Sequence, residues 1–178
     1  MPNYRRARAA GGTFFFTVVT LHRRPVLTHP TVRQALRTAV RHVRAAWPFS
    51  IDAWVLLPDH MHCLWTLPDG DVAYSERWAA IKRAVTQACG IASTDGNRLK
   101  RKEGGLWQRR FWEHQIRDED DFRRHVEYTY WNPVKHGYVS RVVDWPYSTF
   151  HRDVRRGLYA ANWGGLEQAE VAHTGDFG

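Results

Sequence analysis

The sequence has little cysteine and no long apolar run, and these two absences exclude several classes of protein. Its two cysteines, Cys63 and Cys89, form no CxxC pair, so we expect reduced side chains in an intracellular protein, without a disulfide framework or a zinc finger. No stretch approaches the roughly 20 apolar residues of a transmembrane helix. Because no apolar segment of signal-peptide type follows the basic N-terminus, we expect a cytoplasmic protein with no membrane partner.

Acidic residues are also scarce relative to basic ones. Asp and Glu number 18 against 26 Lys and Arg, which gives a net charge of +8. Most of the basic residues are arginines, whose planar guanidinium group binds phosphate through two parallel hydrogen bonds. Aromatic residues make up 13% of the chain. Single-stranded nucleic acid requires cations for its backbone and flat rings for its unstacked bases. The composition therefore favours a nucleic-acid-binding protein; the alternative is a basic protein whose rings all lie in its core.

The length of 178 residues predicts one domain. We assign residues 1–159 to this domain, including a basic N-terminal arm, and expect residues 160–178 to form a weakly ordered tail. The sequence contains no internal repeat and no second domain boundary.

Hydrophobic periodicity predicts four strands and three helices in the order βαββαβα. The strands are expected at 13–21, 51–57, 60–67 and 107–116, and the helices at 31–46, 75–88 and 118–132. Asp118 is a suitable N-cap for the last helix, and Pro133 is expected to end it. A long basic loop is predicted at 90–105. This order fits an α+β, ferredoxin-like sandwich with a mostly antiparallel sheet and helices on one face.

The segment His60-Met61-His62 is the first candidate site. Alternate residues of a strand share a face, so the two histidines project together while Met61 points into the core. Two imidazoles placed in this way can share one metal ion. Taken alone, this short pattern leaves both metal binding and chance open.

The last predicted helix carries the second candidate site. At about 100° per residue, Tyr130 falls on the apolar stripe and is expected in the core. Tyr128 and Asn132 fall on another side of the helix, one turn apart. Tyr128 is therefore a candidate to present its hydroxyl beside an amide. The alternative is that Tyr128 is a half-buried ring and Asn132 only ends the helix.

Several further segments accompany these two sites. The full set is YRR at 4–6, GGTFFFT at 11–17, LPDHMH at 57–62, WQRRFWEH at 107–114, YTYWNPVKHG at 128–137 and DWPYSTF at 144–150. In this combination the chain resembles the single-tyrosine HUH transposases, and within that superfamily the REP-associated tyrosine transposases, a bacterial group derived from insertion-sequence enzymes. The resemblance extends from about residue 4 to about residue 164.

The resemblance implies an enzyme that cleaves and rejoins single-stranded DNA in a metal-dependent reaction. By position, the metal ligands would be His60, His62 and Asn132, and the ion would be Mg²⁺ or Mn²⁺. The nucleophile would be Tyr128, which would form a 5′-phosphotyrosine. Tyr130 is the competing nucleophile, and Tyr128 is preferred because it shares a helix face with Asn132.

Activation of the phenol is a further requirement. An unperturbed tyrosine has a pKa near 10, so Tyr128 must be activated by its surroundings. The metal ion is the first candidate for this role, with His125 or Lys135 as candidate helpers.

The resemblance also implies a substrate and an assembly state. The substrate would be single-stranded DNA hairpins of the REP type, repetitive extragenic palindromes with a 5′ guide sequence at the foot. The protein would be a nucleoid-associated monomer in which Tyr128 acts in cis. The candidate DNA contacts are basic residues, namely Arg5, Arg6, Arg8, Lys100, Arg101, Lys102, Arg109, Arg110, Arg152, Arg155 and Arg156. Trp112, Trp131 and Trp145 are candidates either for stacking on bases or for the core.

Three other functions remain open at this point. The chain could bind REP hairpins in a regulatory or structural role with little cleavage. It could be a rolling-circle or relaxase-type nickase, although its small size and lack of a helicase segment count against this. The two histidines could also hold a purely structural metal ion. The combination of a tyrosine nucleophile with a complete set of ligands favours the transposase-like enzyme.

Overall fold

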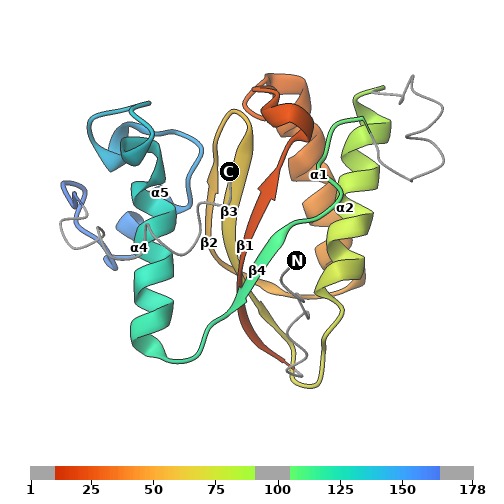
Figure 1. Cartoon of the computed structure of the whole chain (residues 1–178). Coiled ribbons are helices and arrows are strands. Elements are labelled where there is room, and N and C mark those ends of the chain that lie inside the picture. The colour runs from red at the N-terminus through yellow and green to blue at the C-terminus, as the bar shows by residue number, and fades with distance from the viewer. Residues whose placement is uncertain (1–10, 91–104, 165–178) are drawn as a thin grey trace, which may run out of the picture.

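The computed structural model describes residues 11–90 and 105–164 (Figure 1). Its regular elements are β1 (Gly12–Val19), α1 (Pro30–Ala46), β2 (Ser50–Leu56), β3 (His60–Leu67), α2 (Tyr74–Ala88), β4 (Trp112–Gln115), α4 (Glu119–Lys135) and α5 (Phe150–Arg155), with short 3₁₀ turns at Leu21–Arg23 and Val142–Asp144. The predicted arm, most of the predicted loop at 90–105 and most of the predicted tail lie outside the described residues. None of the described helices is both long enough and apolar enough to cross a membrane.

The four strands form one antiparallel sheet with the order β2-β3-β1-β4. This order follows from the sequence of elements, because β2 and β3 form a hairpin and β1 pairs with β3 after a helical crossover. The prediction of an α+β fold with an antiparallel sheet is confirmed. The fourth strand is shorter than predicted, since the first part of the segment at 107–116 makes only an isolated bridge between Trp107 and Thr20.

The sheet is covered by helices on both faces, so the prediction of helices on one face only is wrong. Figure 1 shows α1 and α2 on one side of the sheet and α4 with α5 on the other. The run of three phenylalanines in β1 explains this arrangement. Phe14 and Phe16 belong to the core under α1 and α2, whereas Phe15 points to the opposite face and joins a second core under α4. A second apolar face of this kind must also be removed from water.

Helix α4 begins where the sequence predicts but ends later. The carboxylate of Asp118 accepts a 2.8 Å hydrogen bond from the backbone N–H of Asp121, as expected for an N-cap. Pro133 lies inside the helix, which continues to Lys135, so the prediction that Pro133 ends it is wrong. The helix stops within one turn after the proline, because His136 and Gly137 close it with backbone bonds.

The segment after α4 is more regular than the sequence suggests. It forms α5, whose Phe150 is fully buried in the second core. Of the predicted tail, residues 160–164 are described, and the ring of Trp163 lies 6.0 Å from that of Phe150. This short helix therefore completes the core that holds α4 against the sheet.

Candidate active site

Two histidines of β3 lie side by side on the face of the sheet that α4 covers. The ring centroids of His60 and His62 are 5.0 Å apart, and both residues are buried. Each ring is oriented by an oxygen atom at Nδ1: Asp59 Oδ1 lies 2.6 Å from His60 Nδ1, and Thr17 Oγ1 lies 2.9 Å from His62 Nδ1. When Nδ1 donates to these oxygens, the lone pair of each Nε2 is left for a metal ion.

The surroundings of His62 favour its neutral ring, which is the form that binds a metal ion. Burial lowers the pKa of His62 well below its ordinary value, and the nearby His60 adds to this effect. The hydrogen bond from His60 lowers the pKa of Asp59 to about 2. Asp59 is thus a carboxylate behind His60, which is the arrangement that orients histidine ligands in many metal sites.

Asn132 lies on the side of α4 that is turned toward this pair, as its two neighbours on the helix show. Tyr128 and His136 lie one turn before and one turn after Asn132 on the helix. The ring of Tyr128 is 5.3 Å from that of His62, and the ring of His136 is 5.2 Å from that of His60. Asn132 is fully buried, and neither its Oδ1 nor its Nδ2 atom has a hydrogen-bond partner among the described residues.

An unpartnered buried amide of this kind costs about 1–3 kcal/mol. The cost has an explanation if the Asn132 oxygen serves as a ligand. Two imidazole nitrogens and one amide oxygen are donors suited to Mn²⁺ or Mg²⁺ and leave coordination positions for a substrate oxygen. The residues present therefore fit a divalent metal ion.

Tyr128 lies next to these three side chains. It is buried against Phe15, and its phenolic oxygen accepts a 3.4 Å hydrogen bond from Lys135 Nζ. The same ammonium group lies 5.1 Å from the centre of the Tyr128 ring. Lys135 thus places a positive charge beside the phenolic oxygen of Tyr128.

Tyr130 lies in the core, as the sequence predicts, and its environment differs from that of Tyr128. Its hydroxyl donates a hydrogen bond to Asp153 and lies 3.3 Å from Thr149 Oγ1. The residue is fully buried in the second core, and burial together with Asp153 raises the pKa of its hydroxyl well above the ordinary value. The placement of the two tyrosines thus favours Tyr128 as the nucleophile.

A polar cluster of His114, Asp121 and His125 lies beside the site; the sequence pointed to His125 as a candidate helper but not to its partners. Asp121 accepts a 2.8 Å bond from His114 Nε2 and a bond from the Arg117 side chain, and its carbonyl oxygen lies 2.8 Å from His125 Nδ1. Burial alone would raise the pKa of Asp121, but the bonds from His114 and Arg117 lower it to about 2. Within the described residues it is the one group of three histidine or acidic side chains close enough to share a metal ion.

The role of this cluster follows from its contacts. Its polar atoms bond to one another, and the ring of His125 packs 4.9 Å from that of Phe15, which in turn contacts Tyr128. We interpret it as support for the start of α4. Asp121 and His125 are four residues apart on the helix, a spacing visible in the sequence. His114 comes from β4, opposite Phe15 in the sheet, and no local pattern reveals that pairing.

The candidate DNA contacts are only partly near the histidines. Arg5, Arg6, Arg8, Lys100, Arg101 and Lys102 lie outside the described residues. Arg109 and Arg110 are exposed and follow Gln108, whose backbone N–H bonds to Val19. Because Val19 lies opposite His60 in the sheet, these two arginines lie at the same end of the sheet as the site.

The arginines of α5 lie elsewhere. Arg152 donates hydrogen bonds to the backbone of Ile51 and Asp52 and to Asp153, at the end of β2 that is remote from His60. Arg155 and Arg156 are exposed. The structure does not bring these three together with the histidines.

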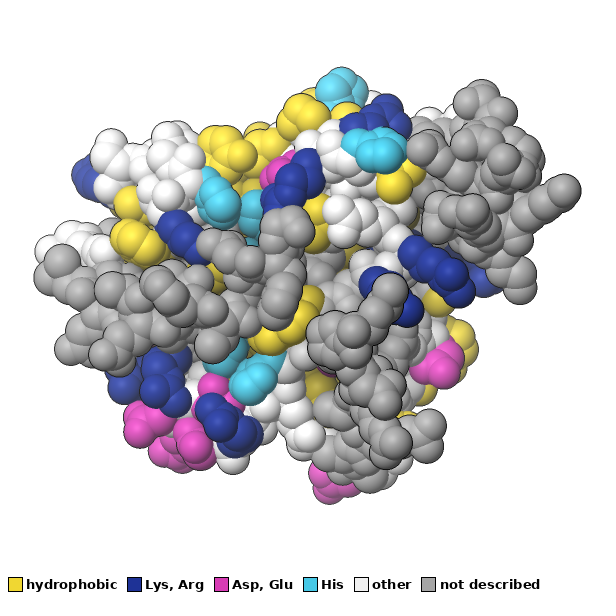
Figure 2. Space-filling view, viewed as in Figure 1, with side chains coloured by type: hydrophobic (Ala, Val, Ile, Leu, Met, Phe, Trp, Pro, Cys, Tyr) yellow, Lys and Arg dark blue, Asp and Glu magenta, His cyan; other side chains and the backbone are white. Residues whose placement is uncertain are grey.

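The surface over the two site histidines carries further histidine side chains and basic side chains. Figure 2 shows histidine and basic side chains over the upper part of this face, whereas the acidic side chains at the lower left lie over the start of α4. The first turn of α4 carries the exposed side chains of Glu119 and Asp120.

Comparison with known proteins shows which family the chain resembles. Residues 12–128 match the sequence model of the family described as "Transposase IS200 like". The REP-associated tyrosine transposase of Escherichia coli strain K12 is 52% identical over 165 residues, covering 93% of this chain and 92% of that protein. A relative from Haemophilus influenzae is 44% identical over 175 residues, covering 96% and 98%.

A solved structure extends the agreement to the fold. It is that of a REP-associated tyrosine transposase bound to a REP hairpin, with a TM-score of 0.80 and 52% identity over 92% of this chain and 91% of that one. The chain therefore belongs to the IS200-like transposase family, a class of tyrosine transposases. Within that family, its similarity over nearly its whole length is to the REP-associated tyrosine transposases, so the resemblance noted in the sequence is confirmed.

Proposed function

We propose that this chain is a metal-dependent endonuclease and strand transferase for single-stranded DNA at REP hairpins. The observation that carries the proposal is the meeting of Tyr128 with His62 and with the unpartnered amide of Asn132 in one buried site. The hairpin substrate is supported by the solved relative, which was captured with a REP hairpin. Since such repeats belong to the chromosome, the protein would act at the nucleoid in the cytoplasm.

His60, His62 and Asn132 would hold the ion, with Mn²⁺ or Mg²⁺ as the candidates. When bound, the ion would act as a Lewis acid on an oxygen of the scissile phosphate. Asp59 and Thr17 hold the two imidazoles in the orientation that this task needs. The ligands come from a strand and a helix, which are more rigid supports than loops.

Tyr128 would carry the covalent step. Its phenolic oxygen forms a bond to the scissile phosphorus as the bond from phosphorus to the 3′ oxygen breaks. The phenol loses its proton, the departing oxygen gains one, and the products are a free 3′-hydroxyl and a 5′-phosphotyrosine. Attack by another 3′-hydroxyl reverses the step and joins a new strand. Lys135 would donate a hydrogen bond to the reacting oxygen of Tyr128 in both directions.

One chain supplies every group that this reaction needs. Tyr128 and His62 lie in contact within the same molecule, and this supports a monomer that acts in cis. A 5′ guide sequence at the foot of the hairpin would direct the scissile phosphate into the site. We place Arg109 and Arg110 among the phosphate contacts, since they lie at the same end of the sheet.

The test uses single-stranded oligonucleotides that carry the repeat hairpins of the host genome. They are incubated with the protein in Mn²⁺, in Mg²⁺ or in EDTA, and a denaturing gel reports a covalent protein–DNA adduct. We expect an adduct with either ion and none in EDTA, and we expect His62→Ala to remove it. Tight hairpin binding without any adduct would instead establish the alternative of a REP-binding protein with little cleavage.

A further inference from the structure

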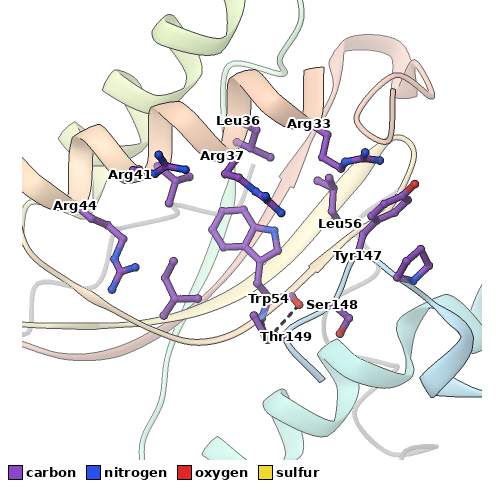
Figure 3. Close-up of a pocket in the computed structure, with 13 residues that line it drawn as sticks. Arg33, Leu36, Arg37, Arg41, Arg44, Trp54, Leu56, Tyr147, Ser148 and Thr149 are labelled. Atoms are coloured by element: carbon purple, nitrogen blue, oxygen red, sulfur yellow. Dashed lines mark hydrogen bonds between the residues drawn. The ribbon is translucent and has the colours of Figure 1, made fainter. Parts of the chain in front are cut away.

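The outer face of α1 carries a row of arginines that the proposed reaction does not use. Arg33, Arg37, Arg41 and Arg44 follow one another at spacings of four, four and three residues, so they lie along one side of the helix (Figure 3). The helix contains no acidic residue. At 1.5 Å per residue, the row is about 16 Å long, which matches about five phosphates of a stacked strand at 3.4 Å spacing.

These arginines form the rim of a cleft between α1 and the edge strand β2. The cleft has a volume of about 590 Å³. Its other lining residues include Trp54, Leu56, Tyr147 and Thr149, and none of the lining residues is acidic. Figure 3 shows the Trp54 ring in the cleft, beneath the arginine side chains.

The far wall of the cleft is held firmly in place. The backbone N–H of Leu56 donates to the carbonyl of Tyr147 at 2.9 Å, and the N–H of Trp54 donates to Thr149 Oγ1 at 2.7 Å. The return bond from Thr149 N–H to the Trp54 carbonyl is 2.9 Å. The segment before α5 thus pairs with the edge of the sheet, and the cleft is a built feature of the fold.

The charge of the rim is not neutralised within the described residues. Arg33 lies over the ring of Tyr147 at 4.5 Å, and Arg44 donates to the carbonyl of Phe49, so neither contact supplies a negative charge. Arg37 and Arg41 are exposed, and no carboxylate of the described residues pairs with them. Four cations around a cleft without a carboxylate create a positive potential that attracts an anionic chain.

The floor of the cleft indicates a second property of the ligand, in addition to its negative charge. The Trp54 ring is half-buried, and on its inner side it packs on Trp65 at 6.3 Å, which fixes its plane. A fixed aromatic ring next to a row of guanidinium groups suits an unpaired base whose phosphates are held outside it. A duplex would hide its bases from Trp54 and use only the charges.

A series of rings connects this cleft with the candidate active site. Their centroids follow at 5.2 Å from His60 to His136, 6.1 Å to Tyr138, 5.4 Å to Trp145 and 5.6 Å to Tyr147. Tyr147 is the ring beneath Arg33. The series passes around the β2 edge of the sheet, from the face with the histidines to the face with α1.

We propose that the α1 cleft binds a single-stranded segment of the same DNA strand that is cut at Tyr128, with bases on Trp54 and phosphates on the arginine row. The inference rests on the proposed function and extends it to a second contact on the substrate. The ring series from His136 to Tyr147 gives the strand a path between the two places.

The experiment compares two oligonucleotides, one limited to the hairpin and its cleavage site and one with an added single-stranded flank. Fluorescence anisotropy measures their dissociation constants for the natural chain and for Arg37→Ala/Arg41→Ala. We expect the flank to tighten binding to the natural chain at least several-fold, and the double variant to lose this gain while its affinity for the short oligonucleotide is unchanged. At about 0.7 per single-strand phosphate, the salt slope for the long oligonucleotide should fall by about 1.4.

The control is Arg83→Ala/Arg124→Ala, which removes the same charge from exposed positions outside the cleft. An equal loss in this control, or an undiminished flank effect in the cleft variant, would overturn the proposal. A flank that works equally well after it is made double-stranded would overturn the single-strand assignment. Adduct formation on the short oligonucleotide tests the proposed function separately, because under the proposal that substrate does not occupy the cleft.

Discussion

Tyr128 and Tyr130 lie two residues apart on α4, and their hydroxyl groups have opposite surroundings. The Tyr128 hydroxyl accepts a hydrogen bond from the ammonium group of Lys135, whereas the Tyr130 hydroxyl donates one to the carboxylate of Asp153. The first neighbour is a cation that donates to the phenolic oxygen, and the second is an anion that holds the phenolic proton and, together with burial, raises the pKa of Tyr130. The two tyrosines are close in sequence, but their hydroxyl groups therefore differ in their chemical surroundings.

This difference predicts unequal effects of the same substitution. Tyr128→Phe should abolish the covalent adduct and leave the dissociation constant for the hairpin within about twofold, because only the nucleophile is removed. Tyr130→Phe should retain the adduct but lower the free energy of unfolding by about 1–3 kcal/mol, because Asp153 loses a buried partner. Denaturing gels and urea unfolding measure the two effects. An adduct that survives in Tyr128→Phe and disappears in Tyr130→Phe would reverse the assignment.

Asn132 provides a prediction about stability in the absence of metal. Asn132→Leu should raise the free energy of unfolding by about 1 kcal/mol in EDTA, since the buried unpartnered amide is removed. We expect Mn²⁺ to raise the Tm of the natural chain, and the variant should lose this rise. Asn132→Asp is the matched variant: it should be less stable in EDTA, because its charge is buried, and should recover in Mn²⁺. An unchanged Mn²⁺ effect in the leucine variant would remove Asn132 from the ligand set.

A substitution at Asp59 should weaken metal binding without abolishing it. Asp59→Asn replaces the carboxylate behind His60, and loss of such a partner weakens metal binding about 10- to 100-fold. Titration calorimetry with Mn²⁺ measures the change. Arg23→Ala is the control, because it removes the other side chain bonded to Asp59 without touching His60. If both variants weaken binding equally, the effect belongs to the loop as a whole.

The lowered pKa of Asp121 predicts how the free energy of unfolding depends on pH. Its pKa in the folded protein is about 2, below the ordinary value of 3.8. A lowered pKa of an acid contributes stability that is complete above about pH 4 and is lost as the pH falls toward 2. The contribution is about 1 kcal/mol, since Arg117 is exposed and its bond is screened by water.

Asp121→Asn should therefore be less stable than the natural chain at pH 7, and its free energy of unfolding should change less between pH 4 and pH 2. Urea unfolding at a series of pH values measures both effects. Asp120→Asn, at an exposed position of the same turn, should leave the pH dependence as it is. Parallel curves for the natural chain and Asp121→Asn would contradict the prediction.

The strand that carries the histidines could be predicted from its sequence because its pattern is local. Alternation in β3 places Met61 in the core under α1 and α2 and the two histidines on the opposite face, and the structure has this arrangement. The different environments of Tyr128 and Tyr130 follow in the same way from helical periodicity. These features depend on residues within one or two turns of each other.

The features that the sequence did not predict depend on contacts between distant residues. Periodicity indicates that Phe15 points away from Phe14 and Phe16, but not that a helix covers it. The pairing of β4 with β1, which brings His114 to Asp121, is likewise absent from any local pattern. The arginines of α1 could be seen to lie away from its apolar face, yet only the packing of residues 146–149 against β2 turns that row into one side of a cleft.

The three consecutive phenylalanines of β1 have a consequence for how the sheet finds its alignment. A shift by one residue exchanges the two faces of a strand, and here it would place phenylalanine against apolar neighbours on either face. Apolar contacts alone therefore specify the alignment weakly. Two hydrogen bonds help to fix the alignment that the apolar contacts leave open. Thr13 bonds to Thr66 and Thr17 bonds to His62, and each bond joins residues that are paired between β1 and β3. His62, which the proposed chemistry needs as a metal ligand, thus also helps to fix the alignment of β1 with β3.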